Sequence, residues 1–249
     1  MTKASIDEQD VLNFALNLEY LEAEFYTHAI TGKSITSFGI GIKGRANGAN
    51  PPDGGATVGG KQVAFSDNER FIHDVVAEIG SDERAHVVLL RGALGSSAVA
   101  KPSIDLAALG FGFDNQNDFL RAARILEDIG VTAYSGAAGF LKTPEIITAA
   151  ACLLGAEAEH AATIRTQIAR LKIPTTALDG VDLVPSPSGP AKQVLSIKDS
   201  DGLIATRTAG QVLYLTFGKA GVKQGGLFPS GLNGTITAST EGAREPVAA

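Results

Sequence analysis

The sequence predicts a mainly α-helical protein: a four-helix bundle with one long crossover connection, followed by a small β-rich C-terminal extension. Three observations lead to this fold class. Four long segments have the start and stop residues of helices. Two of these segments carry a Glu-x-x-His pair, and a connection of about 20 residues separates the first two helices from the last two. Bundles with one long connection have this layout.

The first half of the chain contains two predicted helices, residues 6–31 and 67–94. Each has a capping box at its start and a glycine after its end, namely Ser5 and Glu8 with Gly32, and Ser66 and Glu69 with Gly95. A Gly-rich insert separates the two helices at about residues 38–65. A connection of this length is typical of a lid or another functional loop.

The second half contains predicted helices at residues 116–140 and 144–172. Their ends are marked by Asn115 as an N-cap, by Thr143 before Pro144, and by Pro174 after the last helix. Only a few residues join these two helices, so they must be antiparallel neighbours. The linker from Gly95 to Asp114 can span about 65 Å when extended. It therefore exceeds the roughly 38 Å of a 25-residue helix and can cross the whole bundle.

We expect three parts along the chain. Residues 6–174 form the bundle, residues 175–240 form the β-rich extension and residues 241–249 form a flexible tail. After residue 174 the composition turns to Gly, Ser, Thr and Pro without a helical period. The predicted strands are residues 194–197, 211–217 and 234–238.

Composition excludes several classes of function. The net charge of the 249 residues is −6 and no Lys/Arg block occurs, so nucleic acid and anionic membranes are poor partners by charge attraction. No apolar run reaches the roughly 18 residues of a membrane span. No signal-peptide pattern opens the chain, and we expect a cytoplasmic protein, or an exported one if a leader was removed. The single cysteine, Cys152, excludes an internal disulfide, and we expect it to be buried.

Two Glu-x-x-His pairs, in residues 83–86 and 157–160, carry the predicted chemistry. Positions i and i+3 share one helix face, so each pair can present a carboxylate and an imidazole to one metal ion. The helix before each pair contributes one further glutamate. Four carboxylates and two imidazoles from four helices form a dinuclear metal site in a bundle. The predicted ligands are Glu19, Glu83, His86, Glu127, Glu157 and His160.

A tyrosine follows each of the single glutamates by seven residues, nearly two turns further along the same face. Tyr26 follows Glu19, and Tyr134 follows Glu127, so the second pair repeats the first 108 residues later. We expect each tyrosine to be either a core aromatic residue or a partner of a ligand carboxylate near the reacting oxygen. Glu22, one turn after Glu19, is placed on the flank of the site.

The donor set favours two iron ions, with manganese as the alternative and zinc as a substitute. Four carboxylates buried together without metal would repel one another and take up protons, so burial favours occupancy by cations. Asp82 and Asp128 adjoin predicted ligands and could each orient an imidazole.

The motif-bearing segments resemble the ferritin-like domain proteins of the desiccation-related protein group. The similar stretches are residues 13–26, 81–86, 126–134, 157–160 and 226–234. The resemblance covers most of the chain, from about residue 10 to 238. It implies a ferritin-like four-helix bundle with a stress association. The insert and the C-terminal extension are unlike a cage-forming subunit.

Three hypotheses of function follow. The ligand set favours a metal-dependent oxidoreductase or oxidant scavenger, with O2 or peroxide as substrate. The resemblance, the insert and the extension favour a structural stress protein without catalysis. A third hypothesis is a site that holds one metal ion or is an empty relic. The bundle faces also offer apolar area for a homodimer.

Overall fold

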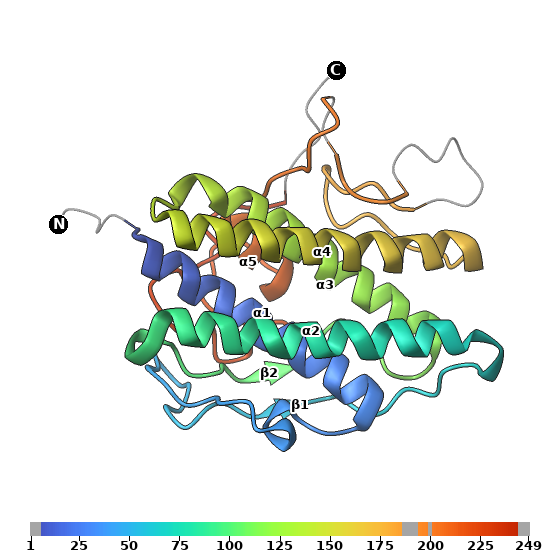
Figure 1. The fold of residues 1–249 in the computed structure, drawn as a ribbon, viewed down its shortest axis with the longest axis horizontal. Helices are drawn as coiled ribbons and strands as arrows, with labels where there is room; N and C mark the ends of the chain where they lie inside the picture. The colour runs from blue at the N-terminus through green and yellow to red at the C-terminus, as the bar shows by residue number, and fades with distance from the viewer. Residues whose placement is uncertain (1–5, 186–193, 199–200, 244–249) are drawn as a thin grey trace.

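The computed structural model describes residues 6–185, 194–198 and 201–243. Four long helices form a bundle: α1 (Glu8–Thr31), α2 (Arg70–Leu94), α3 (Gln116–Ala137) and α4 (Pro144–Leu171). Helix α1 packs along α2, and α3 packs along α4. Figure 1 shows α2 and α4 running along the long axis, with α1 and α3 inclined to them. The predicted mainly α-helical fold is confirmed.

The start of α1 differs from the prediction. Asp7 is the N-cap, and it forms a reciprocal capping box with Asp10. Ser5 lies outside the described residues, and Glu8 is not the second member of a capping box. The Glu8 carboxylate instead accepts a hydrogen bond from the Thr143 N–H at 2.7 Å. It thereby joins the first turn of α1 to the loop before α4.

The other helix ends agree with the sequence except at Ser66 and Thr143, whose side chain makes no capping hydrogen bond with α4. Gly32 and Gly95 end their helices with positive φ angles of 68° and 54°, which glycine adopts without strain. Asn115 caps α3 by accepting a backbone N–H at 3.0 Å. The side chain of Ser66 makes no capping hydrogen bond, so the capping box predicted there is wrong. Short 3-10 helices flank the long ones: η1 (Ile35–Phe38), η2 (Asp67–Glu69), η3 (Gly95–Ser97) and η4 (Ala138–Phe140).

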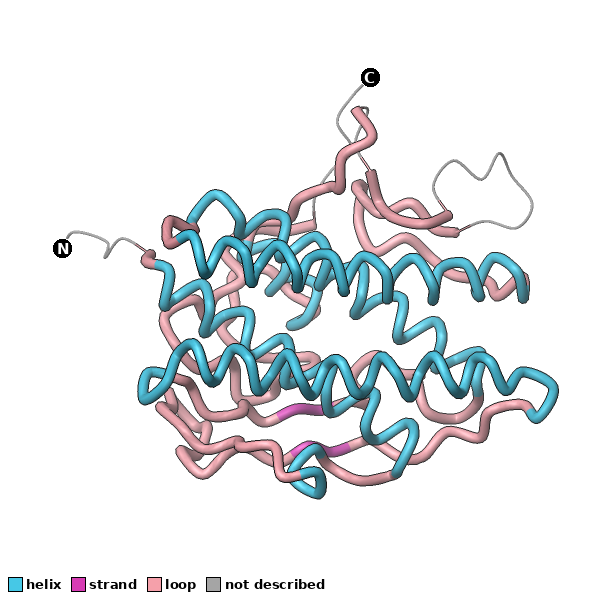
Figure 2. Tube along the Cα trace, in the orientation of Figure 1, coloured by secondary structure: helices cyan, strands magenta, loops and turns pink. Residues whose placement is uncertain are grey.

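The Gly-rich insert is paired with the crossover connection. Strand β1 (Thr57–Val58) lies in the insert and strand β2 (Ile104–Asp105) in the crossover, and the two pair in parallel. Thr57 is in register with Ile104. Figure 2 shows the two strands side by side below the bundle. Both long connections therefore cover the same side of the helices.

The C-terminal extension contains a helix where strands were predicted. Residues 211–217 belong to α5 (Ala209–Phe217), and residues 234–238 form no strand. Residues 194–197 form none either, although Lys198 makes an isolated bridge with Ile204. Thr208 and Gln211 form a capping box at the start of α5, and α5 packs against α3. The prediction of a β-rich extension is thus wrong for its strands. Within the predicted tail, residues 244–249 lie outside the described residues.

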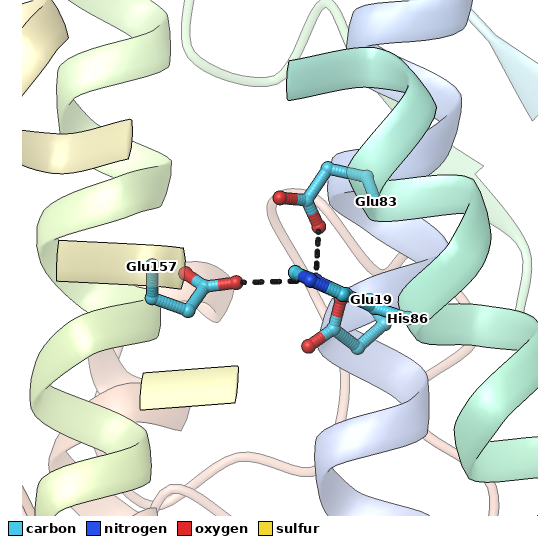
Figure 3. A group of neighbouring side chains, drawn as sticks. All are labelled: Glu19, Glu83, His86 and Glu157. Atoms are coloured by element: carbon cyan, nitrogen blue, oxygen red, sulfur yellow. Dashed lines mark hydrogen bonds and ion pairs between the residues drawn. The ribbon is translucent and has the colours of Figure 1, made fainter. Parts of the chain in front are cut away.

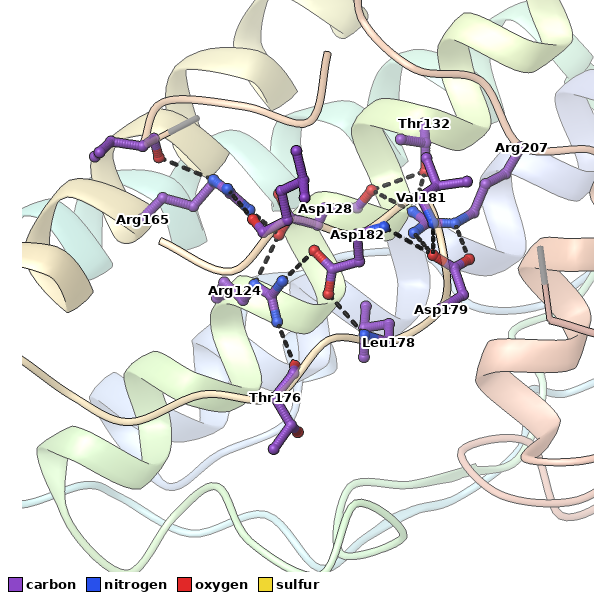
Figure 4. Close-up of polar contacts among 12 residues, drawn as sticks. Arg124, Asp128, Thr132, Arg165, Thr176, Leu178, Asp179, Val181, Asp182 and Arg207 are labelled. Carbon is purple, nitrogen blue, oxygen red and sulfur yellow. Dashed lines mark hydrogen bonds and ion pairs between the residues drawn. The ribbon is translucent and has the colours of Figure 1, made fainter. Parts of the chain in front are cut away.

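Three buried arginines fasten the extension to the bundle (Figure 4). Arg124 and Arg165 both contact Asp128 of α3, at 2.8 and 2.6 Å. Arg207, in the segment before α5, pairs with Asp179 at 2.9 Å. Asp128 therefore forms ion pairs with arginines. The prediction that it orients an imidazole is wrong. The same arginines join the extension to the bundle, because Arg207 donates to the Asp128 carbonyl at 3.2 Å and Arg124 contacts Asp182.

The outer face of α4 carries exposed apolar side chains. Ile147 is 44 % exposed, and Cys152 is exposed as well, so the expectation that Cys152 is buried is wrong. Among the described residues, no helix combines the length and the hydropathy of a membrane-spanning segment. A homodimer through such a face remains a prediction.

Candidate metal centre

The structure brings all six predicted ligands together in the middle of the bundle. Their donor atoms form two groups, within each of which the atoms lie within 4.8 Å of one another: Glu19, Glu83, His86 and Glu157 in one group, and Glu83, Glu127 and His160 in the other. Glu83 belongs to both groups, as expected of a carboxylate between two ions. Figure 3 shows the first group, with Glu157 facing the other three side chains from across the bundle.

The helices deliver these side chains by their periodicity. Glu83 and His86 are one turn apart on α2, and Glu157 and His160 are one turn apart on α4, so each pair lies on the inward face. The four ligand carboxylates are at most 1 % exposed. Such burial of charge is costly unless each carboxylate is paired with a cation or a proton.

Both imidazoles point their Nδ1 atoms into the carboxylates. His86 Nδ1 lies 3.2 Å from an oxygen of Glu19 and 3.5 Å from one of Glu83. His160 Nδ1 lies 3.0 Å from the other oxygen of Glu83. The opposite nitrogen of His160, Nε2, lies 3.3 Å from Asp82. Asp82 is therefore placed to orient this imidazole, as its position in the sequence indicated.

The two tyrosines contact ligand carboxylates in a reciprocal pattern. The Tyr26 hydroxyl on α1 donates a hydrogen bond to Glu127 on α3. The Tyr134 hydroxyl on α3 donates one to Glu19 on α1. Burial first, and then the neighbouring carboxylates, raise the pKa of both hydroxyls well above the ordinary value. Both tyrosines are therefore neutral donors that hold the two single glutamates in place.

Electrostatics in the cluster favour extra protons or cations. Burial and the charge of Glu83 raise the pKa of Glu19 to about 7, and burial and the other carboxylates raise that of Glu157 well above its ordinary range. Burial alone would lower the pKa of His86, but contacts with Glu19 and Glu83 outweigh it and raise the pKa to about 10. Burial opposes ionisation of Glu83 as well, yet the two imidazoles lower its pKa to about 2.

Several buried ligand atoms form no hydrogen bond of normal geometry among the residues that the structure describes, although the imidazoles lie within ion-pair distance of Glu83. They are both oxygens of Glu83, both oxygens of Glu157, Oε2 of Glu127 and Nδ1 of His160. Buried polar atoms are normally satisfied, and each exception needs an explanation. Carboxylate oxygens and imidazole nitrogens are suitable ligands for iron, manganese and zinc. The residues present therefore fit a pair of metal ions.

Glu22 is a member of the buried cluster that the sequence analysis placed on its flank. The residue is only 3 % exposed. Burial, followed by the charge of Glu157, raises its pKa well above the ordinary value. The indication in the sequence was its spacing, because Glu22 lies one turn after Glu19 and so on the same helix face.

An apolar pocket of about 30 Å³ adjoins the cluster. Glu22 and Tyr134 line it on the cluster side, and its walls include Leu18, Ala133 and Leu141. This volume holds one or two water-sized molecules. The pocket therefore limits what can approach this side of the site to very small molecules.

Comparisons with known proteins agree with the helical fold. A family model described as a ferritin-like domain matches residues 7–170, which include all six predicted ligands. A desiccation-related protein of Craterostigma plantagineum is 31 % identical over 182 residues, or 66 % of this chain and 54 % of that relative. The chain thus spans about half the length of the curated relative that it matches. The chain belongs to the ferritin-like domain family.

Proposed function

We propose that this protein binds two iron ions in the bundle and uses them to reduce dioxygen or peroxide. The observation that carries the proposal is the set of six buried donor residues from four helices, several of whose donor atoms lack hydrogen-bond partners. Manganese is the alternative metal, and zinc would be a substitute that cannot change its oxidation state.

The chemistry divides between the metal ions and the side chains. A bound pair of Fe(II) ions would supply two electrons, which with two protons convert one dioxygen molecule to hydrogen peroxide. The side chains orient the ligands: Tyr26 fixes Glu127, and Tyr134 fixes Glu19. Asp82 faces Nε2 of His160 and leaves Nδ1 directed inward. Such partners of ligands commonly change metal affinity or activity by 10–100-fold.

The pocket beside Tyr134 favours dioxygen over peroxide as the oxidant. Its walls are apolar except for Glu22 and Tyr134 at the cluster side, and its volume is about 30 Å³. Hydrogen peroxide would have to leave its hydrogen bonds with water in order to enter, and such transfer is costly. Dioxygen has no such hydrogen bonds to lose.

The name of the Craterostigma relative supports a role in stress, since that protein is described as desiccation-related. Drying concentrates free metal ions and oxidants in a cell. A protein that sequesters Fe(II) and consumes an oxidant would lower both. We therefore propose that the chemistry of the site serves protection under stress.

Anaerobic loading with Fe(II), followed by exposure to O2, tests the proposal. We expect about two iron ions per chain and oxidation faster than that of free Fe(II). The double variant with Glu83→Gln and Glu157→Gln should lose both properties, whereas Glu78→Gln, on the exposed side of α2, should keep them. Binding of fewer than two ions, or oxidation no faster than in buffer, would contradict the proposal.

A structural stress protein without catalysis is the second candidate. It is favoured by the buried arginine network, in which Arg207 and Arg124 join the extension to the bundle without any metal. This candidate predicts that the double variant at Glu83 and Glu157 still protects a desiccation-sensitive enzyme during drying as well as the wild type does. Loss of protection in that variant would exclude it.

A further inference from the structure

Glu22 is a buried carboxylate that the metal centre described above leaves without a role. It is 3 % exposed and lines the small apolar pocket, and no hydrogen bond or ion pair joins its side chain to another described residue. An unpaired buried carboxylate costs several kcal/mol unless it takes up a proton or meets a cation. Its presence therefore calls for a partner that protein atoms do not supply.

The internal repeat shows that Glu22 breaks the symmetry of the site. The position 108 residues later is Gly130, just as Glu127 follows Glu19 by 108 residues. One half of the repeat thus carries an additional carboxylate, and the other half carries no side chain at all. The two positions face each other across the bundle.

The space beside Gly130 is filled by two carboxylates. A Cβ at position 130 would meet Glu157 Oε2 and would lie 3.1 Å from Glu22 Oε1. Both oxygens of Glu157 lack hydrogen-bond partners in the part of the chain that the structure describes. Oxygens of Glu22 and Glu157 therefore converge on one place, where a positive charge would stabilise both.

Glu22 belongs to neither of the two groups of ligand atoms. It borders the space beside Gly130 together with Glu157, which is a member of the four-residue group. The negative charges of the four ligand carboxylates all act on Glu22, which shows that it lies within the same charged cluster. A cation held by these carboxylates would attract Glu22 as well.

We propose that Glu22 is a seventh protein ligand of the metal pair, which it reaches beside Glu157 through the space that Gly130 leaves open. The inference rests on the proposed function in assuming that two ions bind. Five carboxylates supply five negative charges and compensate the six positive charges of two trivalent ions better than four carboxylates do. Glu22 therefore favours the oxidised pair, on the side where the small apolar pocket ends.

The first test replaces the charge while keeping the shape. Isothermal titration with Mn²⁺ should give two equivalents for the wild type and for the exposed-site control Glu78→Gln. In Glu22→Gln at least one equivalent should bind about tenfold or more weakly, in line with the loss of a group that supports a metal site. The midpoint potential of the bound iron pair should also become more positive. Unchanged affinity together with an unchanged potential would overturn the proposal.

The second test fills the space beside Glu22 and leaves its charge in place. Gly130→Ala adds a methyl group where the two carboxylates converge, and alanine is the better helix former by about 1 kcal/mol. Gly155→Ala in α4 is the matched control, because a Cβ there meets nothing within 4 Å. We expect weaker Mn²⁺ binding in Gly130→Ala and wild-type binding in Gly155→Ala. Because the added Cβ also meets the ligand Glu157, Gly130→Ala is combined with Glu22→Gln, and the double variant should bind no more weakly than Gly130→Ala alone. Equal binding by Gly130→Ala and Gly155→Ala would overturn the proposal, even if Glu22→Gln fails to fold.

The two proposals fail in different ways. If the wild type binds fewer than two Mn²⁺ ions, the proposed function is wrong. If the wild type binds two ions and the variants at Glu22 and Gly130 do the same with equal affinity, only the role of Glu22 is wrong.

Discussion

The metal-free protein should lose stability as the pH rises from 5 to 8. Glu19 has a folded-state pKa of about 7, above its ordinary value of 4.5. A group whose pKa is raised on folding holds its proton more tightly in the folded state, so its contribution is complete below the unfolded pKa and disappears as the pH rises through the folded pKa. At about 1.4 kcal/mol per pH unit, Glu19 alone loses about 3 kcal/mol between pH 4.5 and 7.

The other titratable groups of the cluster either lower the free energy of unfolding in the same direction or titrate outside the range from pH 5 to 8. Burial, and then repulsion by other carboxylates, raises the pKa of Glu22 and Glu157, so both add to the loss. His86, raised from 6.5 to about 10, stabilises fully below pH 6.5 and progressively less above it. Glu83, lowered to about 2, stabilises above pH 4.5 and loses its contribution only in strong acid. The net change from pH 5 to 8 is therefore destabilising.

Urea denaturation of chelator-treated protein at pH 5, 6, 7 and 8 measures this effect. The free energy of unfolding should fall by at least about 3 kcal/mol across the series. Glu19→Gln should reduce the slope, and Glu78→Gln should leave it unchanged. Metal binding requires deprotonated carboxylates, so stabilisation by added Mn²⁺ should grow with pH. A free energy of unfolding that stays constant or rises from pH 5 to 8 would refute this account of the cluster.

Three further variants test the contacts that build the fold and the site. Asp179→Ala leaves the buried Arg207 unpaired and should lower the free energy of unfolding by about 3–5 kcal/mol in urea denaturation; a cost below about 1 kcal/mol would show that the pair is not a buried contact in solution. Tyr26→Phe removes the hydroxyl that donates to Glu127 and should cost about 1.5–3 kcal/mol in the metal-free protein by the same measurement; no loss would mean that the hydrogen bond does not form. Asn233→Ala removes an acceptor from a backbone N–H of the Gly-rich insert and should speed proteolytic cleavage of the insert, with an unchanged cleavage rate as the contrary result.

The sequence was sufficient to predict those residues of the site whose positions depend on local helix periodicity. The i, i+3 spacing places Glu83 with His86 on one helix face, whatever surrounds that helix. The repeat identifies Glu19 and Glu127 as matching contributions from the two halves. The reciprocal tyrosine contacts follow from the same repeat, because the two halves face each other in the bundle.

Features that depend on contacts between distant segments could not be predicted in this way. Glu22 shares its helix face with Glu19, and only the packing against Gly130 shows that Glu22 is buried beside Glu157. The order of the insert depends on pairing of β1 with β2 and on Asn233, which lies far away in the sequence. No local pattern encodes such pairs.

The error at α5 has a local cause. Residues 211–217 are rich in β-branched and aromatic side chains, which have high strand propensity. The Thr208–Gln211 capping box starts a helix instead, and Gly218 ends it with a φ of 74°. Packing against α3 then buries an apolar face that includes Val212, Leu213 and Phe217. Tertiary burial thus outweighed intrinsic propensity.

Anomalous scattering from crystals grown with Mn²⁺ or Fe²⁺ tests the central claim most directly. The account predicts two peaks about 3.5–4 Å apart, the spacing of two-metal sites. One peak should lie among Glu19, His86 and Glu157 and the other beside Glu127 and His160, with Glu83 contacting both. A single peak, or none within the bundle at saturating metal, would contradict the account.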